Sequence, residues 1–365
     1  MPSGEQAIFN LLQVSDLHFG DNLGGDAPER LSARLPPLLS RYKHFDGLLG
    51  HHYKALTALH DFYRSLWNQI PKCMLIVSGD LTANGAESQF DLAHGYLSSQ
   101  CAESAFGLGL GYDGWASTSI AGNHDQWPGN NRVLGSPTAG LKKYFQRFPI
   151  IGPRLELRRE LSLRFIFVDS DADVSPWGSD RFFARGHFIS QLTELQNRLP
   201  PAEAGEIRIL VIHHSLMNAA PDDDADQPTR SRMFPPALEI TDHSRKALER
   251  FLLEFDIRVM LCGHLHVPRL STVEVSDGTE KSEILEVRCG ATTQRDNYPY
   301  ELDIDRARKL APNTLVLHKV VQRYRSFFWQ SEVYWRNKSG KFVSTSNYSS
   351  LLPRELKKEI LLFQH

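Results

Sequence analysis

The sequence predicts an α/β fold, in which buried strands alternate with helices that cover them. Short apolar runs such as residues 74–77 are bounded by glycine turns, which is typical of strands covered on both faces. Segments such as residues 51–69 instead repeat apolar side chains at spacings of three and four, which place them on one face of a helix. Several apolar runs also stop at a carboxylate or a histidine, so the predicted strands deliver polar groups at their ends.

The composition is that of a large globular protein without a pronounced charge. The chain has 365 residues, enough for a large core and, by length alone, for two domains. Lys and Arg number 41 against 43 for Asp and Glu, so the net charge of −2 gives no overall attraction to nucleic acid or to an anionic membrane. The four cysteines show no C-x-x-C spacing, and no apolar run approaches the roughly 18 residues of a membrane span. Residues 7–14 read as a strand rather than a signal sequence, so we expect a cytoplasmic protein with reduced cysteines.

Strands and helices are predicted in alternation over most of the chain. Each predicted strand is an apolar run that ends in polar residues, and each predicted helix has an apolar face. The predicted strands span residues 8–14, 74–77, 118–121, 163–168, 207–212 and 257–261. The predicted helices between them span residues 51–69, 87–98, 187–199 and 242–255.

From residue 271 onward the pattern changes to alternating strands. A turn at residues 337–340 and a short helix near residues 353–363 are predicted in this part of the chain. The strands are exemplified by residues 283–288, 314–322 and 325–335.

Three segments are predicted to be loops that determine substrate selectivity. Residues 20–50 are rich in Gly, Pro and polar residues, and residues 126–160 are a further segment that is particular to this chain. Residues 221–236 hold four aspartates, several prolines and two arginines, which favours a loop or a lid.

The polar groups at the strand ends are of the types that bind metal ions. Strand exits on one edge of a sheet converge on a crevice, so these groups are expected to meet. Three or four imidazoles, two carboxylates and an amide oxygen are too many ligands for one zinc ion but suit two divalent cations that share a carboxylate. Such two-metal sites are a recurring device for phosphoester hydrolysis. The groups are Asp16 and His18, Asp80, Asn123 and His124, Asp169, His213, and His264 with His266.

The order of these motifs resembles the calcineurin-like metallophosphoesterase family from residue 8 to about residue 267. The motifs are Asp16-Leu17-His18, Gly79-Asp80, Gly122-Asn123-His124-Asp125, His213 and Gly263-His264-Leu265-His266. The resemblance implies two packed mixed β-sheets flanked by helices, a four-layer α/β/β/α sandwich with a dinuclear metal site at the strand ends. It also implies a catalytic core at residues 1–270. Residues 271–365 would complete the second sheet or cap the core, with the terminal helix at the end.

The resemblance further implies a set of metal ligands and a mechanism. Two divalent ions, drawn from Mn, Fe or Zn, bring four positive charges; Asp16, Asp80 and a bridging hydroxide leave the site positive for a phosphate. The hydroxide would attack phosphorus in line, its pKa lowered by the metals. By the family pattern the first metal is held by Asp16, His18 and His266, the second by Asn123, His213 and His264, and Asp80 bridges them.

Three further residues are expected beside the metals. Family usage makes His124 a hydrogen-bond donor to the phosphoryl group or leaving oxygen, next to Asn123, and Asp125 would orient His124. His213 and His214 are adjacent on an extended segment and point to opposite sides, so only one is expected to reach the metals. We favour His213 as the ligand and expect His214 to line the pocket and contact substrate. The other histidines, at positions 44, 51, 52 and 60, are expected to be solvated.

Within the family, the segments at residues 15–20, 79–85 and 262–266 are most similar to class III cyclic nucleotide phosphodiesterases and related bacterial phosphodiesterases. A small phosphodiester such as a cyclic nucleotide is therefore the expected substrate. Three alternatives stay open: a phosphomonoesterase of small molecules, a nuclease, and a scaffold that lost the metals. The net charge of −2 argues against the nuclease, and the retained ligand types argue against the scaffold. A homo-oligomer is compatible with the strand-rich C-terminal part.

Overall fold

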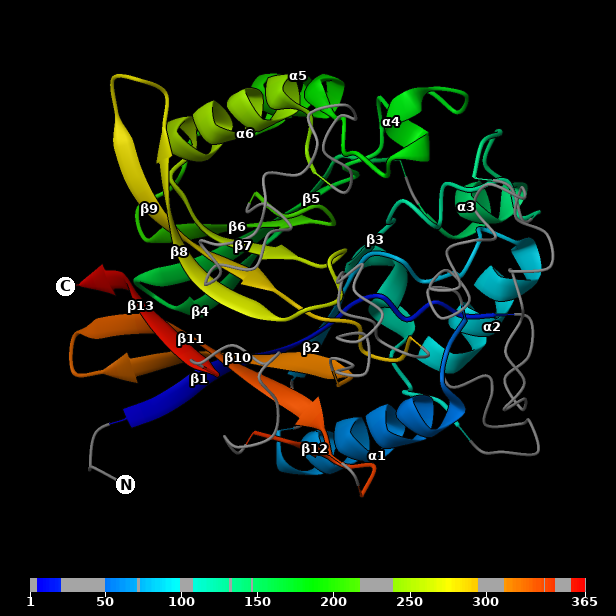
Figure 1. The fold of residues 1–365 in the computed structure, drawn as a ribbon. Helices are drawn as coiled ribbons and strands as arrows, with labels where there is room; N and C mark the ends of the chain where they lie inside the picture. Colours follow the sequence, from blue (N-terminus) through cyan, green and yellow to red (C-terminus); the bar gives the residue numbers. More distant parts are fainter. Residues whose placement is uncertain are drawn as a thin grey trace, which may run out of the picture.

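Two mixed β-sheets pack face to face, and helices cover the outer face of each sheet (Figure 1). This arrangement confirms the predicted α/β/β/α architecture. The structure, a computed structural model, describes residues 5–20, 50–70, 73–98, 108–130, 133–145, 147–216, 239–294, 312–337, 339–344 and 356–364. The predicted loop at residues 221–236, nearly all of the one at 20–50, and His44 lie outside these residues.

The first sheet has the strand order β12-β11-β10-β1-β2-β3, with β13 paired to β11. β1, β2 and β3 run parallel, whereas β10 lies antiparallel to β1. The strands are β1 (Glu5–Val14), β2 (Cys73–Ser78), β3 (Ser119–Ile120), β10 (Thr314–Arg323), β11 (Ser326–Arg336), β12 (Phe342–Val343) and β13 (Lys357–Gln364).

The second sheet has the strand order β4-β5-β6-β7-β9-β8. Its central strands β5, β6, β7 and β9 run parallel, and its two edge strands are antiparallel to their neighbours. The strands are β4 (Ile150–Arg158), β5 (Leu161–Val168), β6 (Glu206–Ile212), β7 (Ile257–Cys262), β8 (Arg269–Ser276) and β9 (Lys281–Arg288).

Alternation along the strands divides the apolar residues among the layers. Leu12 and Leu75 face outward, where they pack in one cluster with apolar residues of the helices next to the first sheet. Leu11 and Ile76, one position away, point into the space between the sheets, where they share a cluster with Val211 of the second sheet. The helices next to the first sheet are α1 (Tyr53–Gln69), α2 (Glu87–Leu97) and α3 (Ala139–Tyr144). Those of the second sheet are α4 (Ser179–Phe182), α5 (Ile189–Arg198) and α6 (Asp242–Glu254), and a 3-10 turn, η4, spans Asp113–Ser117.

A buried polar chain ties the two sheets together beneath the strand ends. Gln13 Nε2 of β1 donates to Ser78 Oγ of β2 at 3.0 Å and to the Cys262 carbonyl of β7 at 2.9 Å. Gln13 Oε1 in turn accepts from His318 Nε2 of β10 at 3.1 Å. Buried polar groups with all partners in place fix the register of the elements that they join.

The terminal helix expected near residues 353–363 is wrong, because residues 357–364 form strand β13. β13 pairs antiparallel with β11, and Ile360 and Leu362 pack against the apolar cluster between the sheets. The apolar residues of this segment fit the periodicity of a helix as well as that of a strand. Pairing with the exposed hydrogen-bonding edge of β11 favours the strand. Strands beyond residue 268 belong to both sheets: β8 and β9 to the second, β10 to β13 to the first. Among the helices of the described residues, none is long and apolar enough to cross a membrane.

Candidate metal centre

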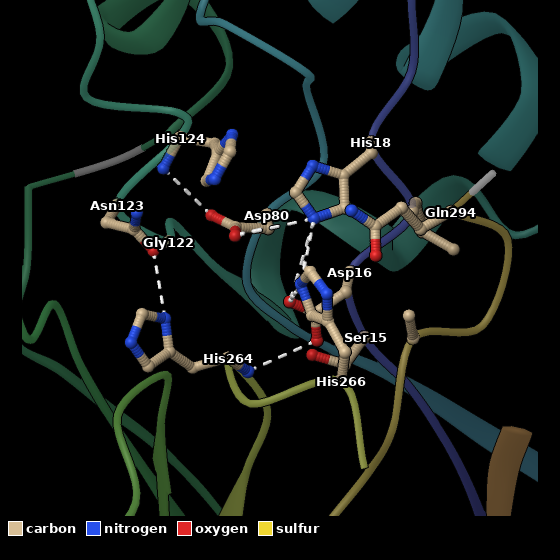
Figure 2. A network of polar contacts seen from close by, with 12 residues as sticks. Ser15, Asp16, His18, Asp80, Gly122, Asn123, His124, His264, His266 and Gln294 are labelled. Carbon is tan, nitrogen blue, oxygen red and sulfur yellow. Dashed lines mark hydrogen bonds and ion pairs between the residues drawn. The ribbon is translucent and has the colours of Figure 1, made fainter. Parts of the chain in front are cut away.

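Polar side chains from five strand ends meet in one largely buried cluster where the two sheets adjoin (Figure 2). The carboxyl ends of parallel strands lie at the same edge of a sheet, so the residues that follow them converge. The cluster consists of Asp16 and His18 after β1, Asp80 after β2, Asn123 and His124 after β3, His213 after β6, and His264 and His266 after β7.

The carboxylates and imidazoles form two groups that have Asp80 in common. Within each group the possible ligand atoms lie within 4.8 Å of one another. The Asn123 amide oxygen adds to the second group, at 3.2 Å from His213 Nε2 and 3.1 Å from His264 Nδ1. The first group is Asp16, His18, Asp80 and His266, and the second is Asp80, His213 and His264.

This donor set fits a pair of divalent cations. His18 Nε2 and His266 Nε2 face each other at 3.3 Å, close enough for both nitrogens to be ligands of one cation. Asp80 Oδ2 lies 3.6 Å from His18 Nε2 and 3.3 Å from His213 Nε2, so the carboxylate stands between the groups. Nitrogen and carboxylate ligands of this kind are accepted by Mn, Fe, Zn and related ions.

Most of the expected ligands occupy strained backbone positions. A non-glycine residue with positive φ costs on the order of 1 kcal/mol or more, and such residues cluster at functional sites. Two pairs, at positions 16 and 18 and at positions 264 and 266, place alternate residues in this conformation, which turns both side chains of a pair into the cluster. The φ values are 52° for Asp16, 49° for His18, 52° for Asp80, 72° for His264 and 56° for His266.

A glycine precedes a ligand in three of the motifs because a larger residue would displace another site residue. A Cβ at Gly122 would collide with Asp80 Oδ1, and one at Gly79 would collide with the His213 ring. At Gly263 the Cβ would collide with Ser15 Oγ and lie 2.9 Å from Asp16 Oδ2. The glycines of these motifs therefore admit the ligands of neighbouring strands, a role that the sequence analysis did not assign.

The charges of the cluster are strongly coupled. Burial alone raises the pKa of Asp80, but the charges of His213 and His124 outweigh burial and lower it. Burial lowers the pKa of His213, but the charge of Asp80 outweighs burial and raises it to about 10. Burial, with the neighbouring imidazoles of His214 and His213, holds the pKa of His264 well below its usual value. The lowered pKa of His264 favours the neutral ring, which is the form that binds a metal, whereas His213 would release a proton when a metal binds.

The expected role of Asp125 is corrected by its contacts. Its Oδ1 accepts from the Thr82 backbone and hydroxyl at 2.8 and 2.7 Å, and its Oδ2 from the backbone N–H of Leu81 and Gly122 at 3.1 and 2.9 Å. The group that orients His124 is the Ala83 carbonyl, which accepts from Nδ1 at 2.8 Å. Burial and then the charge of Asp80 raise the pKa of Asp125 to about 7. Asp125 therefore joins the two loops that carry Asp80 and His124 instead of pairing with the imidazole.

Both ring nitrogens of His214, which was expected to contact substrate, have partners within the protein. Its Nδ1 bonds Ser170 Oγ at 2.7 Å and its Nε2 donates to the Ala184 carbonyl at 3.1 Å. Its ring packs on His264 with centroids 4.1 Å apart, so His214 supports a ligand.

His51 is buried instead of solvated, since its Nδ1 accepts from the Gly20 backbone N–H at 3.0 Å. His52 caps α1 by accepting from the Lys54 backbone N–H at 3.1 Å.

Several supporting residues were missed by the sequence analysis. Thr293 Oγ1 donates to the Leu17 carbonyl at 2.7 Å and Thr292 Oγ1 accepts from Ser15 N–H at 3.1 Å, so both support the exit of β1. Gln126 Nε2 donates to Asp169 Oδ2 at 2.8 Å, which gives Asp169 a supporting place beside the loop of His124. These partners come from distant positions in the chain, and nothing local in the sequence indicates them.

A protein-family model described as calcineurin-like phosphoesterase matches residues 9–268. No curated protein matches the chain.

Proposed function

The chain belongs to the calcineurin-like phosphoesterase family and is a metal-dependent phosphoesterase, and we propose that its substrate is a small phosphodiester such as a cyclic nucleotide. The observation that carries the proposal is the charge of the site. In the described part of the chain, the hydrogen bonds and ion pairs of Asp16, Asp80 and His124 involve no Lys or Arg side chain. A diester carries one negative charge and a terminal monoester about two near neutral pH, so a site without such cations suits the diester better. The resemblance of the motifs to class III cyclic nucleotide phosphodiesterases supports the same substrate class.

Two divalent cations held by this donor set would polarise the phosphoryl oxygens and lower the pKa of a water molecule toward neutrality. The chain's own residues hold and orient the reacting groups. Asp80 and the surrounding imidazoles would hold the two cations, and burial of the cluster strengthens each electrostatic contact within it. The Ala83 carbonyl holds the Nδ1 proton of His124, so that Nε2 is the nitrogen that meets the phosphoryl group or the leaving oxygen.

A substrate panel tests the proposal. Purified protein, as isolated and after loading with Mn, is given cyclic nucleotides, glycerophosphodiesters, single-stranded DNA and phosphomonoesters, with His264→Ala as the inactive control. The highest kcat/KM is expected for a cyclic nucleotide. Faster turnover of the monoesters or of DNA would overturn the diester proposal, and a metal-loaded protein without any turnover would mark a scaffold.

A further inference from the structure

The imidazole of His124 is held on three sides. Trp127 stacks on one ring face, with centroids 4.0 Å apart and an interplanar angle of 24°. His18 meets the ring edge-on, with centroids 4.6 Å apart and an angle of 90°. Ala83 accepts the hydrogen bond of Nδ1. These contacts leave the Nε2 edge as the part of His124 that is available to a substrate, next to Asp80 and His18 in Figure 2.

Trp127 is itself firmly placed. Its side chain is 8% exposed, and its backbone N–H donates to the His124 carbonyl at 3.2 Å. Its carbonyl lies against Gly85, where a Cβ would collide with it. These contacts fix the backbone of Trp127 within the loop that carries Asn123.

The indole also carries a cost that a phenyl ring would avoid. Its Nε1–H is buried and has no hydrogen-bond partner in the described part of the chain. A buried donor without a partner is destabilising. Residues that break a local packing rule in this way are typical of functional sites.

We propose that Trp127 is a positioning residue for the reaction: its indole face holds His124 in the orientation that directs Nε2 at the leaving oxygen. The inference rests on the proposed function. In hydrolysis a P–O bond forms to the oxygen of water and the P–O bond to the leaving alcohol breaks. The leaving oxygen takes a proton from Nε2 of the doubly protonated His124 ring, which keeps the Nδ1 proton that Ala83 accepts. A proton from solvent restores the ring. The proton that the water loses passes to solvent. A leaving group that departs readily as an anion needs little of this help, whereas a poor one depends on it.

A leaving-group series tests the inference. Methyl aryl phosphodiesters whose phenols range from 4-nitrophenol to phenol are hydrolysed by the metal-loaded wild type and by Trp127→Ala, Trp127→Leu and Trp127→Phe. We expect Trp127→Ala and Trp127→Leu to stay within about 3-fold of wild type on the nitrophenyl ester but to lose about 10-fold or more in kcat on the phenyl ester. In both variants kcat should depend more steeply on the pKa of the leaving phenol than in the wild type, as it should in His124→Ala. Trp127→Phe should keep the wild-type dependence.

Trp115 supplies the matched control. It is also buried against an imidazole, since its Nε1 donates to His94 Nδ1 at 3.2 Å, but it lies in the core beside α2. Trp115→Phe should lower the melting temperature without changing how kcat depends on the pKa of the leaving phenol. Metal content is measured for every variant.

Equal losses on all esters in Trp127→Ala and Trp127→Leu, or no loss, would overturn the inference. A wild type that binds metals and hydrolyses no diester would instead overturn the proposed function. Trp127→Leu keeps much of the side-chain volume, so the test does not depend on Trp127→Ala folding.

Discussion

His213 Nε2 lies 3.3 Å from Asp80 Oδ2, while the Ser78 carbonyl accepts a hydrogen bond from His213 Nδ1 at 2.8 Å. The carbonyl holds one ring nitrogen as a donor and thereby directs the other into the second group of ligands. The relationship joins β2 and β6, one strand from each sheet, so the packing of the sheets is part of the metal site.

Replacing His213 by Ala should remove one cation and leave the other. The first group keeps all its ligands, so metal analysis should find about one ion per chain where the wild type holds two. Hydrolysis of bis(4-nitrophenyl) phosphate should fall by more than the roughly 10–100-fold that is typical of losing an outer partner. A variant with two ions and wild-type turnover would remove His213 from the ligand set.

Gly122→Ala should disturb the site through Asp80. The new methyl group would occupy the place of Asp80 Oδ1, so we expect loss of metal and of activity. Gly114→Ala is the matched control, because its Cβ would meet only the Tyr112 ring at an ordinary 3.5 Å. Metal content and kcat of the two purified variants check this. Full metal occupancy in Gly122→Ala would show that the carboxylate does not need this space.

Asp125→Asn should lower stability as well as activity. The amide keeps one oxygen, and its NH2 group would face two of the four donors that the carboxylate now satisfies. Losing two of the four hydrogen bonds of this buried carboxyl group should cost about 2 kcal/mol or more in the free energy of unfolding. Urea unfolding measures this cost. A fall in kcat with unchanged stability would restore the role of orienting His124.

His318 should make the protein sensitive to acid. Burial lowers its pKa to about 3, and Trp329 Nε1 donates to its Nδ1 at 3.2 Å, so the native state holds the neutral ring. Between pH 3 and the ordinary pKa of about 6.5 the unfolded chain binds one more proton than the native state. The free energy of unfolding should therefore fall as pH falls, by up to about 1.4 kcal/mol per unit from this residue.

The comparison is with His318→Gln, which does not titrate. Urea unfolding of both proteins between pH 7 and pH 4 cancels the contributions that they share. At pH 7 the free energy of unfolding should be lower for the variant than for the wild type. Between pH 7 and pH 4 it should fall less for the variant. An equal fall in the free energy of unfolding of both proteins over this pH range would contradict this account of His318.

The candidate metal cluster was predictable because its ligands are side chains of residue types that commonly bind metals. Asp16, His18 and Asp80 follow apolar runs directly, and parallel strands bring such residues together whatever their separation in the chain. The partners of Asp125 and His214 were not predictable, because they are backbone N–H and carbonyl groups such as those of Leu81 and Ala184, whose places depend on the finished fold. Residues of nearly every type carry these backbone groups, so the sequence does not indicate which of them become hydrogen-bond partners.

The same reason explains the strand at residues 357–364. The segment carries apolar residues at spacings that suit a helix or a strand, and the choice depends on the free edge of β11, some 30 positions earlier in the chain. Local periodicity contains no information about that edge.

The central claim is that Asp80 joins two divalent cations at the reacting phosphorus. Its most direct test is hydrolysis of bis(4-nitrophenyl) phosphate by Asp80→Asn, with the metal content of the same sample measured alongside that of the wild type. We predict about two ions per chain in the wild type, and in the variant a loss of metal together with loss of hydrolysis even at saturating Mn. Near-normal turnover by a metal-replete Asp80→Asn protein would contradict the claim.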